Sequence, residues 1–229
     1  MFNKRNFIIL IIIMNMILSV CISMNAFAGI NYAVFMSASA TTDASGNIWI
    51  YVGTGDKTDP SATTGYERVF AIKDSDRSST YTLANLMDIS SASAVYDPNS
   101  TTYHGWYITL GGGGEKIMSA PVNYDQKLYF TTYTPDTIPC GQNGVAKLYI
   151  IDYQTGGGLI NGSRSENIGL GIPSGPVISI NPYGGKYNVY VSTSAANFGT
   201  GSDTVEATDT TTQHSKLKYM IYWKDNRIQ

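Results

Sequence analysis

The chain has 229 residues, with 15 Lys or Arg against 17 Asp or Glu, so its net charge of −2 gives no reason to expect nucleic acid or an anionic membrane surface as a partner. Its 17 tyrosines and its charged fraction of 14% favour half-buried pleated surfaces over solvated helices. Because no long segment carries a 3.6-residue apolar period, we predict an all-β protein.

The first 28 residues, 1–28, have the pattern of a secretory signal peptide. Lys4 and Arg5 precede an apolar run at 7–20, and the Ala-Phe-Ala sequence at 26–28 supplies the small residues that a signal peptidase recognises. We therefore expect cleavage after residue 28 and export of the chain. The alternatives are an uncleaved anchor, for which the run falls short of the roughly 20 residues of a membrane span, and a lipoprotein site ending at Cys21.

The cysteines limit which disulfides the exported chain could form. The sequence has two cysteines, and removal of the signal would leave only Cys140, which then could form no internal disulfide. We interpret Cys140 as a loop thiol. The alternative is a bond to another chain, since exported proteins meet an oxidising compartment.

A threefold repeat organises the chain from residue 29 to residue 229. Each repeat has a small-residue lead-in, a tight turn, an aromatic strand, a variable connection and a second apolar strand, over the ranges 37–110, 115–172 and 173–225. We expect the aromatic strands at 47–54, 127–132 and 186–193. We expect their partners at 68–74, 147–152 and 218–223. The turns before the aromatic strands are predicted at 45–47, 124–126 and 183–185.

Further short strands are expected at 104–110 and 166–170, which gives the first two repeats about four strands each. Four strands are the content of one propeller blade, so we predict a partial β-propeller of about three four-stranded, quinoprotein-like blades. Propellers usually close with about four to eight blades. Three blades therefore predict either an open arc or a ring completed by a companion chain or by self-association through open blade edges.

Several sequence segments, in this order, carry a family resemblance. The first are D-A-S-G-N-I-W-I-Y-V-G-T-G-D at 43–56 and R-V-F-A-I-K-D at 68–74. The others are G-W-Y-I-T-L at 105–110, G-E-K-I at 114–117, F-T-T-Y-T-P at 130–135, P-C at 139–140, L-Y-I-I-D at 148–152, T-G at 155–156, G-I-P-S-G-P-V at 171–177 and Y-W-K at 222–224. Together they resemble the C-terminal propeller region of the PilY/PilC family, the type IV pilus tip-associated adhesins and biogenesis factors.

This resemblance implies a quinoprotein-type propeller at or near the pilus tip that influences pilus extension, retraction and attachment. The implied partners are pilins or minor pilins, together with a host or surface receptor. The implied locations are the periplasm, the outer membrane surface or the pilus fibre. Family members usually carry a large N-terminal region as well, which this sequence does not contain between the expected signal and the first repeat.

The family's propeller often binds calcium, and Asp43, Ser45 and Asn47 are the candidate ligands here. Their oxygen-bearing side chains alternate, as they do in a calcium loop. However, the twelfth position of such a loop falls on Thr54, so no bidentate Glu closes the site. We favour the alternative that Asp43 begins a hairpin turn, and we predict no other cofactor.

The sequence does not favour catalysis. His104 and His214 are the only histidines, and neither has a recognisable catalytic partner in the sequence. The glycine run at 111–114 before Glu115 and Lys116 lacks the Gly-Lys-Ser/Thr ending of a phosphate loop, so we interpret it as a turn. A quinone enzyme would need a whole ring around its cofactor, which three blades cannot provide. We therefore predict that the protein is not an enzyme.

The aromatic strand residues are expected to pack between the blades rather than to form a recognition surface: Trp49, Tyr51, Tyr129, Tyr149, Tyr190 and Trp223. The predicted function is a non-catalytic role in type IV pilus biogenesis or tip adhesion. Binding is expected through the loops at 75–101, 134–145 and 199–215. One alternative is an exported periplasmic or surface scaffold without a pilus role, completed by a partner chain or by oligomerisation. The other is a quinoprotein-like enzyme fragment.

Overall fold

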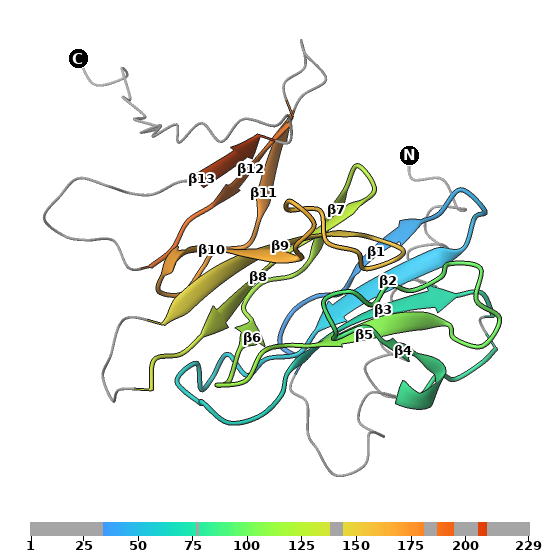
Figure 1. Ribbon diagram of the computed structural model, residues 1–229, viewed down its shortest axis with the longest axis horizontal. Coiled ribbons are helices and arrows are strands. Elements are labelled where there is room, and N and C mark those ends of the chain that lie inside the picture. The colour runs from blue at the N-terminus through green and yellow to red at the C-terminus, as the bar shows by residue number, and fades with distance from the viewer. Residues whose placement is uncertain (1–33, 77, 138–143, 181–186, 195–205, 210–229) are drawn as a thin grey trace, which may run out of the picture.

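The computed structural model describes residues 34–76, 78–137, 144–180 and 187–194, together with the backbone of 206–209. These residues form three open sheets and one short 3-10 helix, so the predicted all-β class is confirmed (Figure 1). In this part of the chain no helix has the length and apolar character needed to cross a membrane. The expected signal peptide, Cys140, His214 and Trp223 lie outside the described residues.

Sheet 1 is formed by strands from the first predicted repeat. Its order is β1-β2-β3-β5-β4, in which β1, β2, β3 and β5 form an antiparallel meander and β4 runs parallel to β5. The strands are β1 (Ser39–Thr42), β2 (Ile48–Gly53), β3 (Arg68–Asp74), β4 (Met87–Asp88) and β5 (Gly105–Thr109). Both faces of the two central strands are covered, which explains why β2 and β3 are almost continuously apolar rather than alternating.

Sheet 2 is formed by strands from the second predicted repeat. Its strands are β6 (Lys116–Ile117), β7 (Val122–Tyr124), β8 (Lys127–Thr134), β9 (Val145–Asp152) and β10 (Ser165–Leu170). The strands β8, β9 and β10 are antiparallel neighbours, while β6 and β7 both pair with the other edge of β8. Pro121 lies between these two short strands, and its missing N–H explains why the edge strand is divided there.

Sheet 3 has the described order β11 (Val177–Ile180), β12 (Tyr187–Val191) and β13 (Glu206–Asp209). The strand β13 corrects the prediction that 199–215 is entirely a loop. Its backbone pairs with the aromatic strand β12, with position 208 opposite Val189 in the register. The expected partner at 218–223 lies outside the described residues.

Two of the three predicted turns lie among the described residues, and both are confirmed. Residues 45–47 join β1 to β2, with Gly46 at a φ of 81°. Residues 124–126 join β7 to β8, where Tyr124 pairs directly with Lys127. The third turn, at 183–185, is outside the described residues, although the flanking residues Ile180 and Tyr187 are paired.

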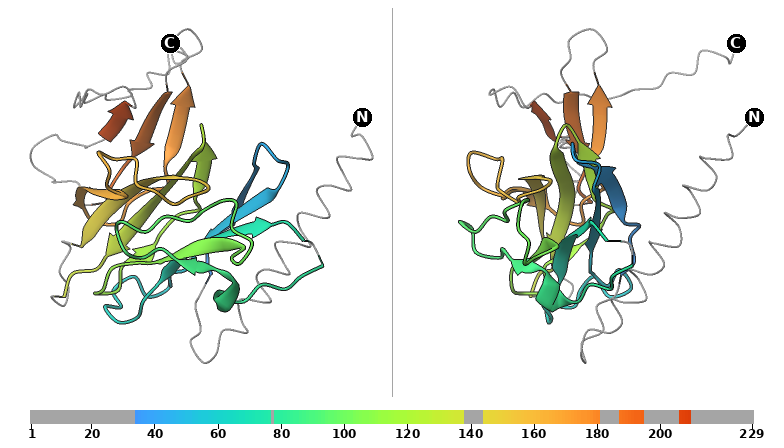
Figure 2. Two further views of the ribbon diagram at one scale, coloured as in Figure 1. Left: turned by 45° about the vertical axis from the view of Figure 1, so that its right-hand side comes forward. Right: turned by 90° about the vertical axis from the view of Figure 1, so that its right-hand side faces the viewer.

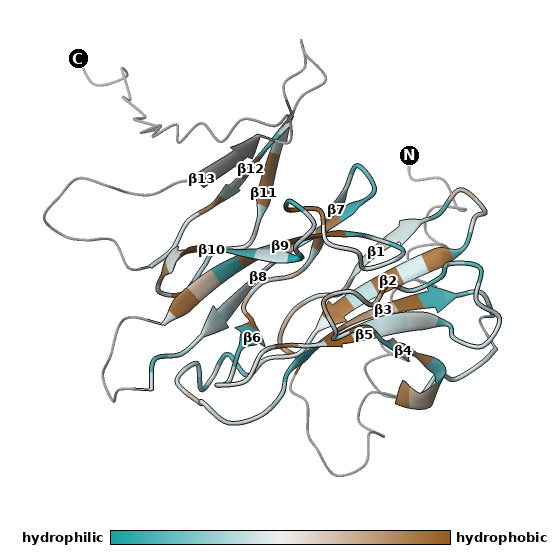
Figure 3. Ribbon diagram, in the orientation of Figure 1, coloured by the Kyte–Doolittle hydropathy of each residue, from teal (hydrophilic) through white to brown (hydrophobic). Residues whose placement is uncertain are grey.

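The three sheets pack in succession through their apolar faces (Figure 2). One cluster joins sheets 1 and 2 and includes Trp49, Trp106 and Phe130. A second cluster joins sheets 2 and 3 and includes Tyr129 and Val189. Apolar residues of β2 and β3 supply much of the first interface and of the opposite face of sheet 1 (Figure 3).

Most of the aromatic residues predicted for the core are buried there. Trp49, Tyr51, Tyr129 and Tyr149 all lie in the clusters between sheets. The prediction is wrong for Tyr190, which is partly exposed. Neighbouring side chains of a strand point to opposite faces, and Val189 and Val191 take the core face of β12, so Tyr190 faces away from sheet 2.

The long insertion at 75–101, expected to be a binding loop, is for the most part packed against the sheets. It contains the helix η1 (Leu83–Asn85) and strand β4, and it buries the side chains of Leu86, Ile89 and Tyr96. Arg164 fastens the same segment to sheet 2 by donating hydrogen bonds to the carbonyl oxygens of Ser91 and Ala94. The insertion therefore acts largely as a structural cover, because its apolar residues complete the core.

Candidate functional site

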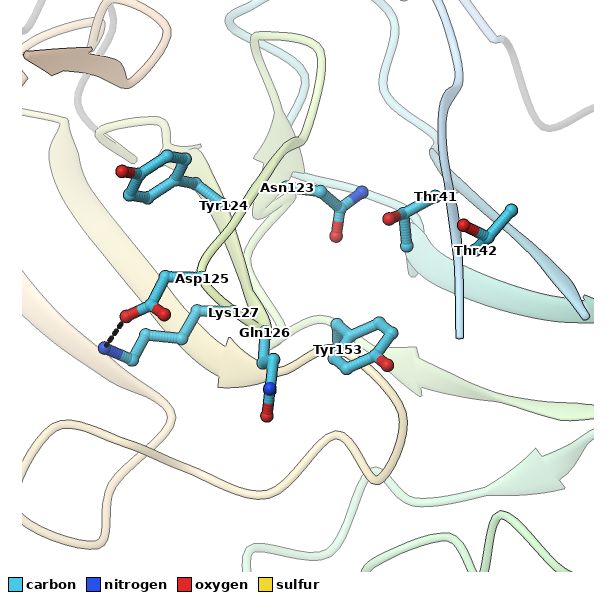
Figure 4. Close-up of a pocket in the computed structure, with 8 residues that line it drawn as sticks. All are labelled: Thr41, Thr42, Asn123, Tyr124, Asp125, Gln126, Lys127 and Tyr153. Atoms are coloured by element: carbon cyan, nitrogen blue, oxygen red, sulfur yellow. Dashed lines mark hydrogen bonds and ion pairs between the residues drawn. The ribbon is translucent and has the colours of Figure 1, made fainter. Parts of the chain in front are cut away.

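A pocket of about 300 Å³ lies at the seam between sheets 1 and 2, where the turn from β7 to β8 approaches β1 (Figure 4). Its lining is mostly polar and includes two tyrosines, Tyr124 at the end of β7 and Tyr153 in the turn after β9. The lining residues are Thr41, Thr42, Asn123, Tyr124, Asp125, Gln126, Lys127 and Tyr153. The pocket thus depends on three segments that are far apart in the sequence.

The rim of the pocket is a two-residue hairpin turn with an unusual composition. Asp125 and Gln126 have φ angles of 50° and 59°, which lie in the left-handed region. Such turns normally use Asn-Gly or Asp-Gly, because Gly adopts positive φ without strain. The structure therefore keeps a long carboxamide side chain, that of Gln126, at a position where glycine would fit the backbone better.

Tyr153 is held firmly on the other side of the pocket. The carboxylate of Asp152 accepts hydrogen bonds from the backbone N–H groups of Gln154 and Thr155, which fixes the turn after β9. The backbone N–H of Tyr153 donates to the carbonyl oxygen of Gln126 at 3.3 Å. The Tyr153 ring also meets the Trp49 ring in a T-shaped arrangement, with 6.4 Å between centroids.

Asn123 connects the two sheets beside the pocket. Its Nδ2 donates a hydrogen bond to the hydroxyl oxygen of Ser39 on β1 at 3.0 Å. Its Oδ1 is buried and has no hydrogen-bond partner among the described residues. In Figure 4 this oxygen points into the hollow between Thr41 and Tyr153. A buried acceptor without a partner is unfavourable, so this oxygen is an unused hydrogen-bonding position.

The charged residues of the pocket are paired with each other and with tyrosines. Lys127 Nζ lies 3.4 Å from the carboxylate of Asp125 and donates to the Tyr187 hydroxyl at 2.7 Å. Burial alone would lower the pKa of Lys127, but the hydrogen bond to Tyr187 and the charge of Asp125 raise it. The Tyr187 hydroxyl also lies 2.7 Å from that of Tyr129, whose pKa is raised by burial. The pocket therefore combines a stable cation with a neighbouring anion, and its lining carries little net charge.

The calcium candidates Asp43, Ser45 and Asn47 do come together at the turn from β1 to β2. Asp43 Oδ1 accepts the backbone N–H groups of Ser45 at 2.9 Å and Asn47 at 2.8 Å. Its Oδ2 accepts the side-chain N–H groups of Asn47 at 2.9 Å and Trp49 at 3.1 Å. Burial would raise the pKa of Asp43, but these hydrogen bonds outweigh burial and lower it.

This geometry is that of the predicted hairpin turn. Four N–H donors occupy the Asp43 carboxylate, and Ser45 contributes its backbone rather than its hydroxyl. Calcium binding at these residues stays a prediction, and a cation would have to compete with the N–H donors. Across the described residues, no group of three or more His, Cys, Asp or Glu side chains is placed to hold a metal ion.

The residues after the glycine run at 111–114 have structural roles. Glu115 is 1% exposed, and its carboxylate accepts hydrogen bonds from Thr132, Tyr149, Lys147 and the backbone of Gly111. Lys116 is buried as well, and its ammonium donates to the carbonyl oxygens of Asp59 and Ala62. Burial lowers the pKa of Lys116. The glycine run therefore leads into two buried charges that fasten neighbouring segments.

His104 stacks on the Tyr81 ring, with 4.6 Å between centroids. Asp76, at the end of the insertion nearest β3, accepts hydrogen bonds from Ser78 and Ser79, which lower its pKa to about 2. The His104 ring is therefore packed against Tyr81, and Asp76 belongs to a turn that is exposed to solvent. Neither residue reaches the pocket lining.

Sequence reasoning identified residues 124–126 as a turn but missed the pocket around them. The available signal was the turn sequence itself, since Asp-Gln stands where Asp-Gly would be expected. The approach of Thr41 and Tyr153 could not be seen, because it depends on how the sheets pack.

Comparisons with protein-family models, with curated proteins and with solved structures found no match to this chain.

Proposed function

We propose that this chain is an exported, non-catalytic module of a partial β-propeller that takes part in type IV pilus biogenesis or pilus-tip adhesion. The main support for the proposal is the way in which sheets 1 and 2 pack against each other. Each contains a four-stranded antiparallel meander, β1-β2-β3-β5 and β7-β8-β9-β10, and the two pack face to face. The first strands of the two meanders are linked by the hydrogen bond between Asn123 and Ser39. Propeller blades pack in this manner around an axis.

The segments that resemble the PilY/PilC family support this proposal, because they coincide with parts that define the sheets. The segment at 43–56 spans the first turn and β2, and the segment at 68–74 is the paired strand β3. The G-E-K-I segment at 114–117 contains the two buried charges described above. These three segments therefore include residues with clear structural roles in sheets 1 and 2.

The proposed partners are pilins or minor pilins, with a host or surface receptor as the target of adhesion. Binding would use exposed residues of the 75–101 insertion, and the proposal extends to the segments at 134–145 and 199–215. Enzymatic activity is not part of the proposal, because a quinone enzyme requires a closed ring of positioned groups around the cofactor.

One observation favours the second candidate function, an exported scaffold completed by a partner chain or by oligomerisation. The face of sheet 3 that points away from sheet 2 carries Val177, which is 61% exposed, opposite the partly exposed Tyr190. In a full propeller this face would pack on another blade. A companion chain or a second copy would cover it.

The test is a fractionation of the native host. The chain is tagged, surface fibres are sheared off, and fibre, periplasmic and membrane fractions are blotted with and without a pilin deletion. Signal in the fibre fraction that disappears without pilin is the expected result. Signal confined to the envelope, together with a stable oligomer by light scattering, would contradict the pilus role and support the scaffold.

A further inference from the structure

We propose that the pocket between β1 and the turn from β7 to β8 binds a neutral, hydroxyl-rich ligand about the size of a monosaccharide. This inference rests on the geometry of the pocket alone and does not require the pilus role. Its volume, about 300 Å³, is at the lower end for small-molecule sites, so a single sugar ring is the appropriate scale.

The charges of the lining argue against an ionic ligand. The only charged lining residues are Asp125 and Lys127, and they are 3.4 Å apart. Lys127 also donates to the Tyr187 hydroxyl and lies over its ring, 5.3 Å from the centroid. An anion would have to separate Lys127 from these partners, and a cation would have to displace Lys127 from Asp125. This cost is modest because the pair is partly exposed, and a neutral ligand avoids it.

The uncharged lining groups can both donate and accept hydrogen bonds. Thr41 and Thr42 provide hydroxyls, Gln126 provides a carboxamide, and Asn123 Oδ1 is a buried acceptor without a partner in the described part of the chain. Sugar hydroxyls also do both, so they match such a lining. Asn123 Oδ1 is shielded from solvent, so a ligand hydroxyl would pair with it only after a side-chain shift opened this atom to the pocket, and that pairing would remove an unfavourable unpaired acceptor.

The Tyr153 side of the lining is held in place and has an apolar component. The backbone of Tyr153 is bonded to Gln126 and to the Tyr51 hydroxyl, while its ring packs on Trp49. A tyrosine ring offers an apolar face beside a polar tip, which suits the C–H face of a sugar. Tyr153 is therefore held in place before a ligand binds, whereas binding would order the exposed side chains of Thr42 and Gln126.

Because the backbone of Gln126 is in the left-handed region, a substitution there can remove a ligand contact without disturbing the fold. Glycine suits its φ of 59° better, so Gln126→Gly removes the carboxamide while preserving the turn. Asn123→Ala removes the unpaired acceptor, and Asn99→Ala is its matched control at an exposed position outside the pocket.

The full-length chain is titrated with glucose, galactose and N-acetylglucosamine in saturation-transfer NMR, with acetate and phosphate as anionic probes. At least one sugar is expected to bind. Its affinity should fall about tenfold in Gln126→Gly and in Asn123→Ala, as expected for a lost ligand hydrogen bond, and stay unchanged in Asn99→Ala. Oligosaccharides that end in the sugar that binds are then titrated in the same way. Binding of the oligosaccharide as tightly as the free sugar, or more tightly, indicates the terminal residue of a surface glycan, and weaker binding indicates a free sugar.

Failure of all three sugars to bind would overturn the proposal. So would undiminished binding by folded Gln126→Gly, or binding of the anionic probes in place of the sugars. Circular dichroism of each variant establishes that it is folded, and Gln126→Gly provides the test if Asn123→Ala does not fold. The fractionation experiment above is independent of these outcomes.

Discussion

The Tyr129 hydroxyl of β8 lies 2.7 Å from the Tyr187 hydroxyl of β12, so a hydrogen bond joins sheet 2 to sheet 3 within their shared apolar cluster. The same Tyr187 hydroxyl receives a hydrogen bond from Lys127 and lies 3.3 Å from the Asp125 carboxylate. The polar group at this junction therefore also restrains the two charged residues of the pocket. A substitution at Tyr187 should therefore affect both the packing of sheet 3 on sheet 2 and the positions of Asp125 and Lys127 in the pocket.

Replacing Tyr187 with Phe is expected to lower the free energy of unfolding by about 1–2 kcal/mol, because the buried Tyr129 hydroxyl loses its partner. Hydrogen exchange should show faster opening in β11 and β12 than in sheet 1, since the lost contact fastens only sheet 3. Tyr190→Phe is the matched control, because Tyr190 lies on the other face of β12. Equal acceleration in all sheets would contradict a local role.

Replacing Glu115 with Ala is expected to lower the free energy of unfolding by about 2–4 kcal/mol. The change leaves the buried hydroxyls of Thr132 and Tyr149 without their acceptor, whereas Lys147 is 32% exposed and can turn to water. Glu115→Gln keeps the shape and one acceptor, so it should be less destabilising. Urea unfolding of both variants measures the difference, and equal midpoints for Ala and wild type would refute the role assigned to this carboxylate.

Two glycines with positive φ should respond differently to alanine. At Gly105, with φ of 130°, a Cβ would overlap the carbonyl oxygen of Ala71 on the paired strand β3. At Gly46, with φ of 81°, a Cβ would meet open space. We expect Gly46→Ala to lower the unfolding free energy by about 1 kcal/mol and Gly105→Ala by about 3 kcal/mol or more. Thermal unfolding of the two variants checks this order.

The contribution of Asp43 to stability should depend on pH. Its pKa is lowered in the folded protein, so the contribution is present above the unfolded value of about 3.9 and is lost as the pH falls through the folded pKa. Asp43→Ala should therefore cost about 1–2 kcal/mol at neutral pH, where Trp49 and the turn lose their acceptor.

Below the folded pKa of Asp43 the difference between wild type and Asp43→Ala should shrink, because the wild-type carboxylate is then protonated too. Asp97→Ala is the control, since Asp97 is exposed and accepts the backbone N–H of Asn99 in a similar local turn. Urea unfolding at neutral and acidic pH gives the comparison. A destabilisation by Asp43→Ala that is the same at both pH values would argue against a role for the charge.

The sequence alone determined the longer strands and the turns of the first two repeats, but not the short strands β1, β4, β6 and β7. Aromatic and β-branched residues, the absence of a helical apolar period, and turn residues such as Gly46 act over a few positions, so they can be recognised without knowing the fold. The strand Arg68–Asp74 agrees with its predicted range, and both predicted turns among the described residues are present. Most of the predicted core aromatics are also buried.

Only the tertiary structure decided which residues meet across the sheets. The pairing of β12 with β13, the outward position of Tyr190, and the packing of the 75–101 insertion all depend on which surface each segment covers. The pocket depends in the same way on β1, on the Asp125–Gln126 turn and on Tyr153, which are distant along the chain. Local patterns specify strands and turns through short-range preferences, whereas a pocket between sheets arises from contacts that form only when the sheets pack.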